Sequence, residues 1–227
     1  MGNPAPRNAE KIAILGIENA GKTSIIKVLT HEFDLLMKLK PTVSVERTFI
    51  DLLGKELVIW DFGGQETYRD KYLESPERYF NDISYIFYVL DIQDPTLLGS
   101  NIMYFQGVYR RIKKYSPKAK FILLFHKLDP NLKLPDVAKK LQKEFLDAVT
   151  PDIDEKLGEE AEFKLFPTSI FNPRSIVYAF TKSLFTAQDL SEAISDVLKH
   201  FVEQYGVYFA SLRSEEHTSE LQSPNTI

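Results

Sequence analysis

The stretch that decides the fold runs from Gly16 to Thr23 and reads GIENAGKT. It matches the phosphate-loop pattern G-x-x-x-x-G-K-[ST], in which glycines let successive backbone N–H groups turn toward one anion. The apolar run at 12–15 before it predicts a buried strand, and apolar spacing over Lys22–Leu36 predicts a helix after it. Because a helix N-terminus attracts phosphate, this order predicts a nucleoside-triphosphate site.

The phosphate loop also predicts individual binding residues. Lys22 would place its ammonium on the outer phosphates, and the Thr23 hydroxyl would bind Mg²⁺. The other predicted loop residues supply backbone N–H groups or line the loop: Gly16, Glu18, Asn19, Ala20, Gly21 and Ser24.

Strand-like and helix-like segments alternate along the rest of the chain. A hairpin is predicted where Val45–Leu53 and Leu57–Trp60 flank Gly54-Lys55, and later strands are predicted at Ser84–Leu90, Phe121–Phe125 and Glu162–Phe166. Helices are predicted over Leu97–Tyr115 and Pro135–Val149, the second ended by Thr150-Pro151 before an acidic loop at Asp152–Glu160. The alternation predicts an α/β P-loop fold: a six-stranded, mostly parallel sheet with one antiparallel hairpin strand and helices on both faces.

The amino-acid composition is typical of a soluble globular protein. Of 227 residues, 44% are apolar and 26% charged, and the net charge of −4 disfavours a nucleic-acid surface. No cysteine is present for disulfides or thiolate metal sites, and no apolar run approaches the ~20 residues of a transmembrane segment. We therefore expect a cytoplasmic protein, peripheral on membranes at most through a partner. We expect no fixed structure in 1–9, one domain over 10–212, and a non-native, adapter-like tail (RSEEHTSELQS) in 213–227.

Polar residues follow the predicted third strand. In Trp60-Asp61-Phe62-Gly63-Gly64-Gln65, Asp61 leaves a buried strand beside the phosphate loop and is predicted to hold Mg²⁺. Gly63 lets a backbone N–H approach the γ-phosphate, and Gly64 joins the predicted binding residues.

Two later strand ends predict which base is bound. Asp129, in His126-Lys127-Leu128-Asp129, can accept hydrogen bonds from the N1–H and N2–H₂ groups of guanine. Adenine lacks this donor pair and would leave a desolvated carboxylate unpaired. The stem of Lys127 can cover the base, and the loop Thr168-Ser169-Ile170 can offer N–H groups to guanine O6. With His126 included, these residues predict a guanine site, and GTP or GDP with Mg²⁺ as the bound group.

These motifs resemble the small-GTPase superfamily, first its Rag/Gtr branch and second the Arf-like proteins. GIENAGKT and WDFGGQE are similar to both branches. The stretches YLESPERYFNDISYIFYVLD at 72–91, SPKAKFILLFHKLD at 116–129 and TSIF at 168–171 resemble the Rag branch, as does His126 in a position where most small GTPases carry Asn. The resemblance covers roughly residues 11–210. Rag proteins continue into a dimerisation domain, for which no room is expected after Leu212, so only the nucleotide switch is carried over.

The resemblance implies a switch with slow, Mg²⁺-dependent GTP hydrolysis. Thr42 would be the switch residue that reaches both Mg²⁺ and the γ-phosphate, and Gln65 would orient the attacking water beside Lys22. The segments Lys38–Glu46 and Phe62–Phe80 would respond to nucleotide and contact protein regulators and effectors. Three arginines near them could act as an internal finger or be solvated: Arg47, Arg69 and Arg78.

Apolar residues spaced along Leu190–Tyr208, after a capping box at Thr186–Asp189, predict an amphipathic helix. It could pack on the domain's own sheet or dock a partner in a dimer. Two other functions remain open for the whole chain: a pseudo-GTPase scaffold that binds nucleotide without hydrolysing it, and a P-loop kinase or ATPase.

Overall fold

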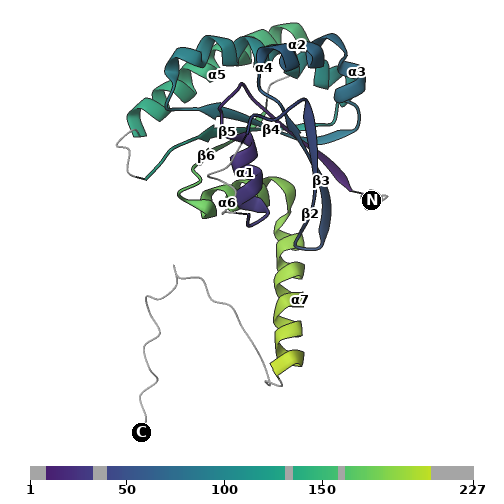
Figure 1. The fold of residues 1–227 in the computed structure, drawn as a ribbon. Helices are drawn as coiled ribbons and strands as arrows, with labels where there is room; N and C mark the ends of the chain where they lie inside the picture. The colour runs from purple at the N-terminus through teal and green to yellow at the C-terminus, as the bar shows by residue number, and fades with distance from the viewer. Residues whose placement is uncertain (1–8, 33–39, 131–134, 158–161, 206–227) are drawn as a thin grey trace. The chain divides into compact units, whose positions relative to one another are not determined.

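The computed structural model of the chain describes residues 9–32, 40–130, 135–157 and 162–205. Elements alternate as the sequence predicts, and they are labelled in Figure 1. The strands are β1 (Glu10–Leu15), β2 (Val45–Leu52), β3 (Lys55–Phe62), β4 (Ile83–Asp91), β5 (Lys120–His126) and β6 (Phe163–Thr168). The helices are α1 (Lys22–Leu29), α2 (Glu66–Glu74), α3 (Pro76–Tyr79), the 3₁₀ turn η2 (Pro95–Leu97), α4 (Leu98–Tyr115), α5 (Pro135–Leu157), α6 (Pro173–Leu184) and α7 (Ala187–Tyr205).

The strands form one six-stranded sheet in the order β2-β3-β1-β4-β5-β6. β2 and β3 are antiparallel and every other neighbouring pair is parallel, which confirms the predicted fold class. The hairpin turn is Leu53-Gly54, where both residues have positive φ, 53° and 79°. Because β1 is central and parallel to its neighbours, the phosphate loop that follows it lies at the same sheet edge as the carboxyl ends of β3, β4 and β5.

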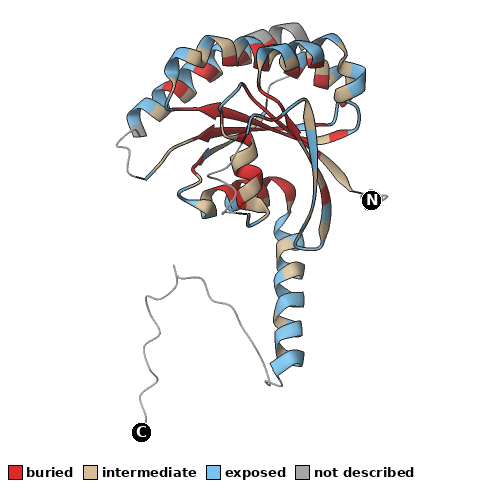
Figure 2. Cartoon of the chain, in the orientation of Figure 1, coloured by how far each residue is buried: buried red, intermediate tan, exposed pale blue. Residues whose placement is uncertain are grey.

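Helices cover both faces of the sheet. α1 and α6 pack together on one face, and α2, α3, α4 and α5 lie on the other (Figure 1). The central strands are buried almost throughout, as Figure 2 shows, because each is covered by helices above and below. Between β4 and α6, the rings of Phe87 and Phe180 stack with centroids 3.9 Å apart.

Two predicted helix ends were wrong. The first helix ends at Leu29, where Thr30 caps it and His31 takes the left-handed conformation with φ 57°. Of the predicted Lys22–Leu36 helix, 33–36 lie outside the described residues. The fifth helix does not stop at Thr150-Pro151 but runs through Pro151 to Leu157, so the segment predicted as an acidic loop begins as helix. Val149 and Ile153 on either side of Pro151 are both buried in the core, and this packing outweighs the lost backbone hydrogen bond.

The described residues fall into two units, one that ends at Leu184 and one that begins at Phe185. The described part of the second unit is mainly α7, which begins at a capping box as predicted. Asp189 Oδ2 accepts from the N–H and hydroxyl of Thr186, and Asp189 N donates back to Thr186 Oγ1. The docking role of this helix stays a prediction. The predicted tail at 213–227 and residues 1–8 lie outside the described residues. Among the described residues, no helix combines the length and apolar content needed to cross a membrane.

Candidate functional site

The phosphate loop joins β1 to α1 and is shaped by two glycines with positive φ. Gly16 has φ 148°, and a Cβ there would lie 2.4 Å from the carbonyl oxygen of Val89 on β4. Gly21 has φ 96° and forms the N-cap of α1. Only glycine takes these angles without strain, and both positions lack space for a side chain. The sequence pattern therefore reflects a backbone that must pass close to β4 and β5.

Lys22 lies buried at the centre of this loop. Its Nζ donates to the carbonyl oxygens of Gly16, at 3.0 Å, and Ile17, at 2.6 Å. Burial lowers the pKa of Lys22 to about 8, against an opposing influence from the carboxylate of Asp61. A buried ammonium next to a helix N-terminus is stabilised by a nearby anion, which fits the predicted phosphate contact.

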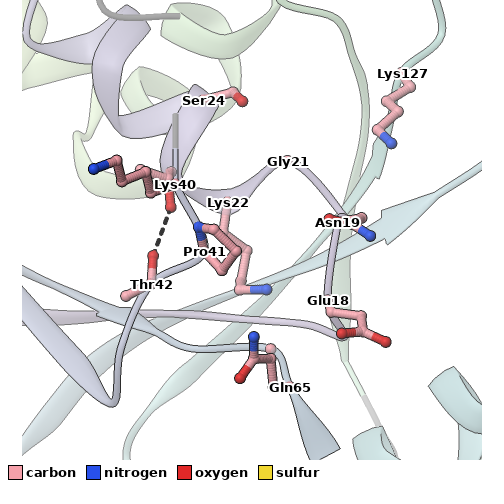
Figure 3. Close-up of a pocket in the computed structure, with 12 residues that line it drawn as sticks. Glu18, Asn19, Gly21, Lys22, Ser24, Lys40, Pro41, Thr42, Gln65 and Lys127 are labelled. Carbon is pink, nitrogen blue, oxygen red and sulfur yellow. Dashed lines mark hydrogen bonds between the residues drawn. The ribbon is translucent and has the colours of Figure 1, made fainter. Parts of the chain in front are cut away.

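Three oxygen-bearing side chains meet beside the first turn of α1. Asp61 Oδ2 accepts from Thr23 Oγ1 at 2.6 Å and from Thr42 Oγ1 at 3.0 Å, and the two hydroxyls lie 2.9 Å apart. Figure 3 draws the contact between the hydroxyls as a dashed line. The other oxygen, Asp61 Oδ1, is buried and has no hydrogen-bond partner in the described part of the chain.

This cluster fits Mg²⁺. Burial raises the pKa of the Asp61 carboxyl, so its charged form needs a positive partner. Hydroxyl and carboxylate oxygens are the ligands Mg²⁺ takes, and it ordinarily completes its shell with water and phosphate rather than with a full protein cage. From the sequence, Thr23, Thr42 and Asp61 were each predicted to bind Mg²⁺. In the structure, the three side chains are in contact.

The chain after β3 closes one side of the loop. Gly64 lies against the phosphate loop so tightly that a Cβ would sit 2.4 Å from the carbonyl carbon of Ile17. Gln65 follows as the N-cap of α2, and its side chain faces the cavity across from Lys22 (Figure 3).

The two segments predicted to respond to nucleotide contact each other. The carbonyl oxygen of Ser44 accepts from Gly63 N at 2.7 Å and from Tyr72 Oη at 2.7 Å. Tyr72 and Phe80 are buried, and Tyr68 and Tyr79 pack partly buried against the core. Lys38 and Leu39 of the predicted first segment lie outside the described residues. The Ser44 carbonyl, two residues after Thr42, therefore connects this segment to Gly63 and to Tyr72 on α2.

The predicted base-binding residues meet at the ends of β5 and β6. The His126 ring lies against the phosphate loop, and a Cβ on Gly21 would be 2.5 Å from its Cδ2. His126 Nδ1 also lies 2.9 Å from the hydroxyl of Thr168. Burial lowers the pKa of His126 to about 4, so its imidazole is neutral near pH 7. His126 thus connects the phosphate loop to β6.

Asp129 is held by side chains from two other loops. Its Oδ1 accepts from Ser169 Oγ at 2.5 Å and its Oδ2 from Gln93 Nε2 at 2.8 Å. Lys127, with φ 66°, pairs through Nζ with Asp91 Oδ2 at 2.5 Å. Ile170 lies in the turn after β6. Gln93 and Asp91 were not predicted, because an isolated Gln or Asp after a strand carries no motif.

A cavity of about 480 Å³ opens between these groups. Most of the predicted phosphate and metal residues line it, together with Lys127 from the base end (Figure 3). Lys40 and Pro41 also line it and were not among the predicted site residues. The predicted residues on its wall are Glu18, Asn19, Gly21, Lys22, Thr23, Ser24, Thr42, Gly64, Gln65 and Lys127. Gly16, Ala20, Asp61, His126, Asp129, Thr168, Ser169 and Ile170 are not among its lining residues.

None of the three arginines near the switches lines this cavity. Arg47 lies over the Trp60 ring, with Cζ 4.1 Å from its centroid, and Arg78 lies over Tyr79 at 5.6 Å. Arg69 lies over Tyr104 at 5.1 Å, and its buried Nε has no hydrogen-bond partner among the described residues. The structure thus gives no support to an internal arginine finger.

A sheet of this order with a phosphate loop after its central strand defines a P-loop G-protein fold. The solved structure of the small GTPase Arl6 (BBS3) of Trypanosoma brucei, with the bound nucleotide analogue GppNp, superposes with a TM-score of 0.57. It covers 83% of this chain and 99% of its own, at 17% identity. That likeness confirms the fold.

Residues 11–218 match the Gtr1/RagA G protein conserved region, and the chain belongs to this family. The GTP-binding protein GTR1 of Saccharomyces cerevisiae is 27% identical over 171 residues, 73% of this chain and 53% of that protein. The Ras-related GTP-binding protein B of Rattus norvegicus is 27% identical over 133 residues, 58% of this chain and 33% of that protein. An ADP-ribosylation factor-like protein, alp41 of Schizosaccharomyces pombe, is 33% identical over 84 residues, 37% of this chain and 42% of its own. The chain thus spans about half the length of GTR1.

Proposed function

We propose that this chain is a GTP- and GDP-binding molecular switch that hydrolyses GTP slowly with Mg²⁺. The observation that carries the proposal is the meeting of Thr23, Thr42 and Asp61 within 3.0 Å of one another beside the buried ammonium of Lys22. A phosphate beside Lys22 and a divalent cation beside the three oxygen-bearing side chains would suit the charges of these groups. The cavity beside them reaches Lys127 at the base end.

In this proposal each residue has a defined task. Lys22 would bind the outer phosphates, and Thr23, Thr42 and Asp61 would hold Mg²⁺, a group that supplies positive charge beside the phosphates. Gln65 accepts a hydrogen bond from the attacking water and positions it. Phosphoryl transfer through a metaphosphate-like transition state needs positioning and charge stabilisation rather than covalent help. No arginine lines the described cavity, so we expect slow turnover until a partner protein adds a positive charge.

The switch itself would act through the Ser44 carbonyl. Thr42 gains a contact when the γ-phosphate is bound, and Ser44 is tied to Gly63 and Tyr72. The equilibrium between two arrangements of α2 and α3 would then depend on the nucleotide. Regulators and effectors would bind Lys38–Glu46 and Phe62–Phe80, and α7 remains the proposed docking helix for a dimer partner. We also propose a cytoplasmic location, with any membrane contact made through a partner.

Nucleotide competition tests the base. GTP and GDP should displace a fluorescent GDP analogue, whereas ATP should not displace it at a hundredfold excess. Asp129→Asn should shift the preference toward xanthine nucleotides, because an amide donates to the xanthine 2-oxo group where a carboxylate cannot. Equal displacement by ATP would instead favour the kinase or ATPase alternative.

A further inference from the structure

Gln93 reaches from the loop after β4 to the end of β5 and is held there at both ends. Its backbone N–H donates to Asp91 Oδ1 at 2.9 Å. Its side-chain Nε2 donates to the carbonyl oxygen of Lys127 at 2.8 Å and to Asp129 Oδ2 at 2.8 Å. The residue is exposed, so no packing requirement explains these contacts. These contacts place the amide donor of Gln93 against Asp129, the carboxylate that binds the base in the proposed function.

We propose that Gln93 is a specificity-determining residue of the purine site, which shares Asp129 Oδ2 with the exocyclic 2-amino group of guanine. The inference rests on the proposed guanine-nucleotide function. It names a second ligand class for the site, the inosine nucleotides, whose base keeps the 6-oxo group and N1–H and lacks the 2-amino group.

The reasoning concerns the donors available to Asp129. Guanine offers two donors, N1–H and N2–H₂, and hypoxanthine offers only N1–H. A carboxylate oxygen that a bound base shields from water and leaves without a donor costs free energy. Ser169 already donates a hydrogen bond to Oδ1, and Gln93 donates one to Oδ2 whether or not the base also donates. Gln93 therefore lessens the penalty that inosine nucleotides would otherwise carry.

Two arrangements of the bound state are possible, and both predict the same direction of change in the ratio of GDP affinity to inosine diphosphate affinity when Gln93 is removed. A carboxylate oxygen has room for two donors. If Gln93 and the 2-amino group bind Oδ2 together, removing Gln93 weakens inosine diphosphate and leaves GDP nearly unchanged. If they compete for Oδ2, removing Gln93 strengthens GDP and leaves inosine diphosphate nearly unchanged. In both cases the ratio of GDP affinity to inosine diphosphate affinity rises when the Gln93 donor is lost.

The test measures both affinities by displacement of a fluorescent GDP analogue, at fixed Mg²⁺, for the wild-type chain, Gln93→Ala and Gln93→Met. Gln93→Met keeps the length of the side chain and adds no charge beside Asp129, but removes the donor. We expect the affinity ratio to rise about fivefold in both variants, which corresponds to one hydrogen bond of average net strength. Gln106→Ala is the matched control, since Gln106 Nε2 also donates to a backbone carbonyl, that of Ala148, and lies on α4. Its ratio should equal that of the wild type.

A ratio that stays unchanged in both Gln93 variants would overturn the inference. So would an equal loss of both nucleotides, since that result makes Gln93 a structural residue only. The proposed function has a separate control in the same plate: wild-type GDP against ADP. If the wild type prefers GDP strongly and only the Gln93 ratio is flat, this inference alone fails. If GDP and ADP bind alike, the proposed function fails first.

Discussion

Gly21 of the phosphate loop lies directly against the ring of His126, with 2.5 Å between an added Cβ and the ring Cδ2. This contact joins the phosphate end and the base end of the site, because His126 also bonds the Thr168 hydroxyl on β6. The binding of both the phosphates and the base of a nucleotide would therefore depend on the position of the buried His126 ring.

Gly21→Ala should abolish tight nucleotide binding. The new methyl group would collide with His126, and the φ of 96° disfavours any L side chain, so the loop must move. We expect GDP affinity to fall at least about a hundredfold, measured by equilibrium binding of a fluorescent GDP analogue. Gly54→Ala is the matched control, since Gly54 has φ 79° but open space around a Cβ. It should lose about 1 kcal/mol of stability and keep its affinity. Equal affinity in both variants would contradict the role of the contact.

Asp61→Asn should remove the effect of Mg²⁺ on nucleotide release. The variant loses a charged ligand, so the ratio of GDP release rates in EDTA and in Mg²⁺ should fall about tenfold. The nucleotide-free variant should be no less stable than the wild type, because a buried carboxylate is replaced by a neutral amide. Asp51→Asn is the control: its Oδ1 accepts from Gly54 N in the hairpin, and it should keep the wild-type ratio. An unchanged ratio in Asp61→Asn would remove Asp61 from the metal site.

Gln65→Leu should slow hydrolysis without weakening binding. Leucine has a similar volume and cannot orient water, so single-turnover hydrolysis of GTP should slow about tenfold or more while GTP affinity stays within twofold. Gln106→Leu makes the same change on α4 and should leave the rate unaltered. Identical rates for the wild type and Gln65→Leu would favour the pseudo-GTPase scaffold.

The contribution of His126 to the stability of the nucleotide-free protein should fall as the pH drops from about 6.5 toward 4. Burial lowers the pKa of His126 to about 4 in the folded state, whereas the unfolded chain takes up that proton near pH 6.5. At this residue the unfolded state therefore binds more protons in this window, and the His126 contribution to the free energy of unfolding rises with pH by up to about 3 kcal/mol, against an opposing contribution from the raised pKa of Asp61. Urea titrations at several pH values should show a smaller slope in His126→Asn. A His126→Asn slope equal to that of the wild type would refute the assignment.

Trp60 should report nucleotide exchange. It is the only tryptophan, adjoins Asp61, and has Lys11 Nζ 3.7 Å and Arg47 Cζ 4.1 Å from its ring centroid. Because Arg47 lies on β2, a shift of the segment after Thr42 would change the cations over the ring and so the emission. We expect a change in fluorescence when GDP is replaced by a GTP analogue with Mg²⁺, and none in Asp129→Asn with the same guanine nucleotides. A flat trace in the wild type would count against a conformational switch.

The sequence by itself determined the phosphate-loop motif and the α/β order, because each depends on local backbone chemistry. A left-handed glycine, a helix N-terminus and a buried apolar strand are properties of short segments. The wrong helix end at Pro151 shows where such local rules stop. Proline favours ending a helix, and the burial of Val149 and Ile153 overrides that preference only once the sheet is present to pack against.

Only the tertiary structure decided which residues share a contact. Thr23 and Asp61 are 38 residues apart in the chain, and their 2.6 Å hydrogen bond exists because β1 and β3 are neighbours in the sheet. Gln93 carries no motif and reaches Asp129 only because β4 and β5 are paired to their ends. Local propensity cannot encode such distances, since they follow from strand order and register, which the whole core fixes together.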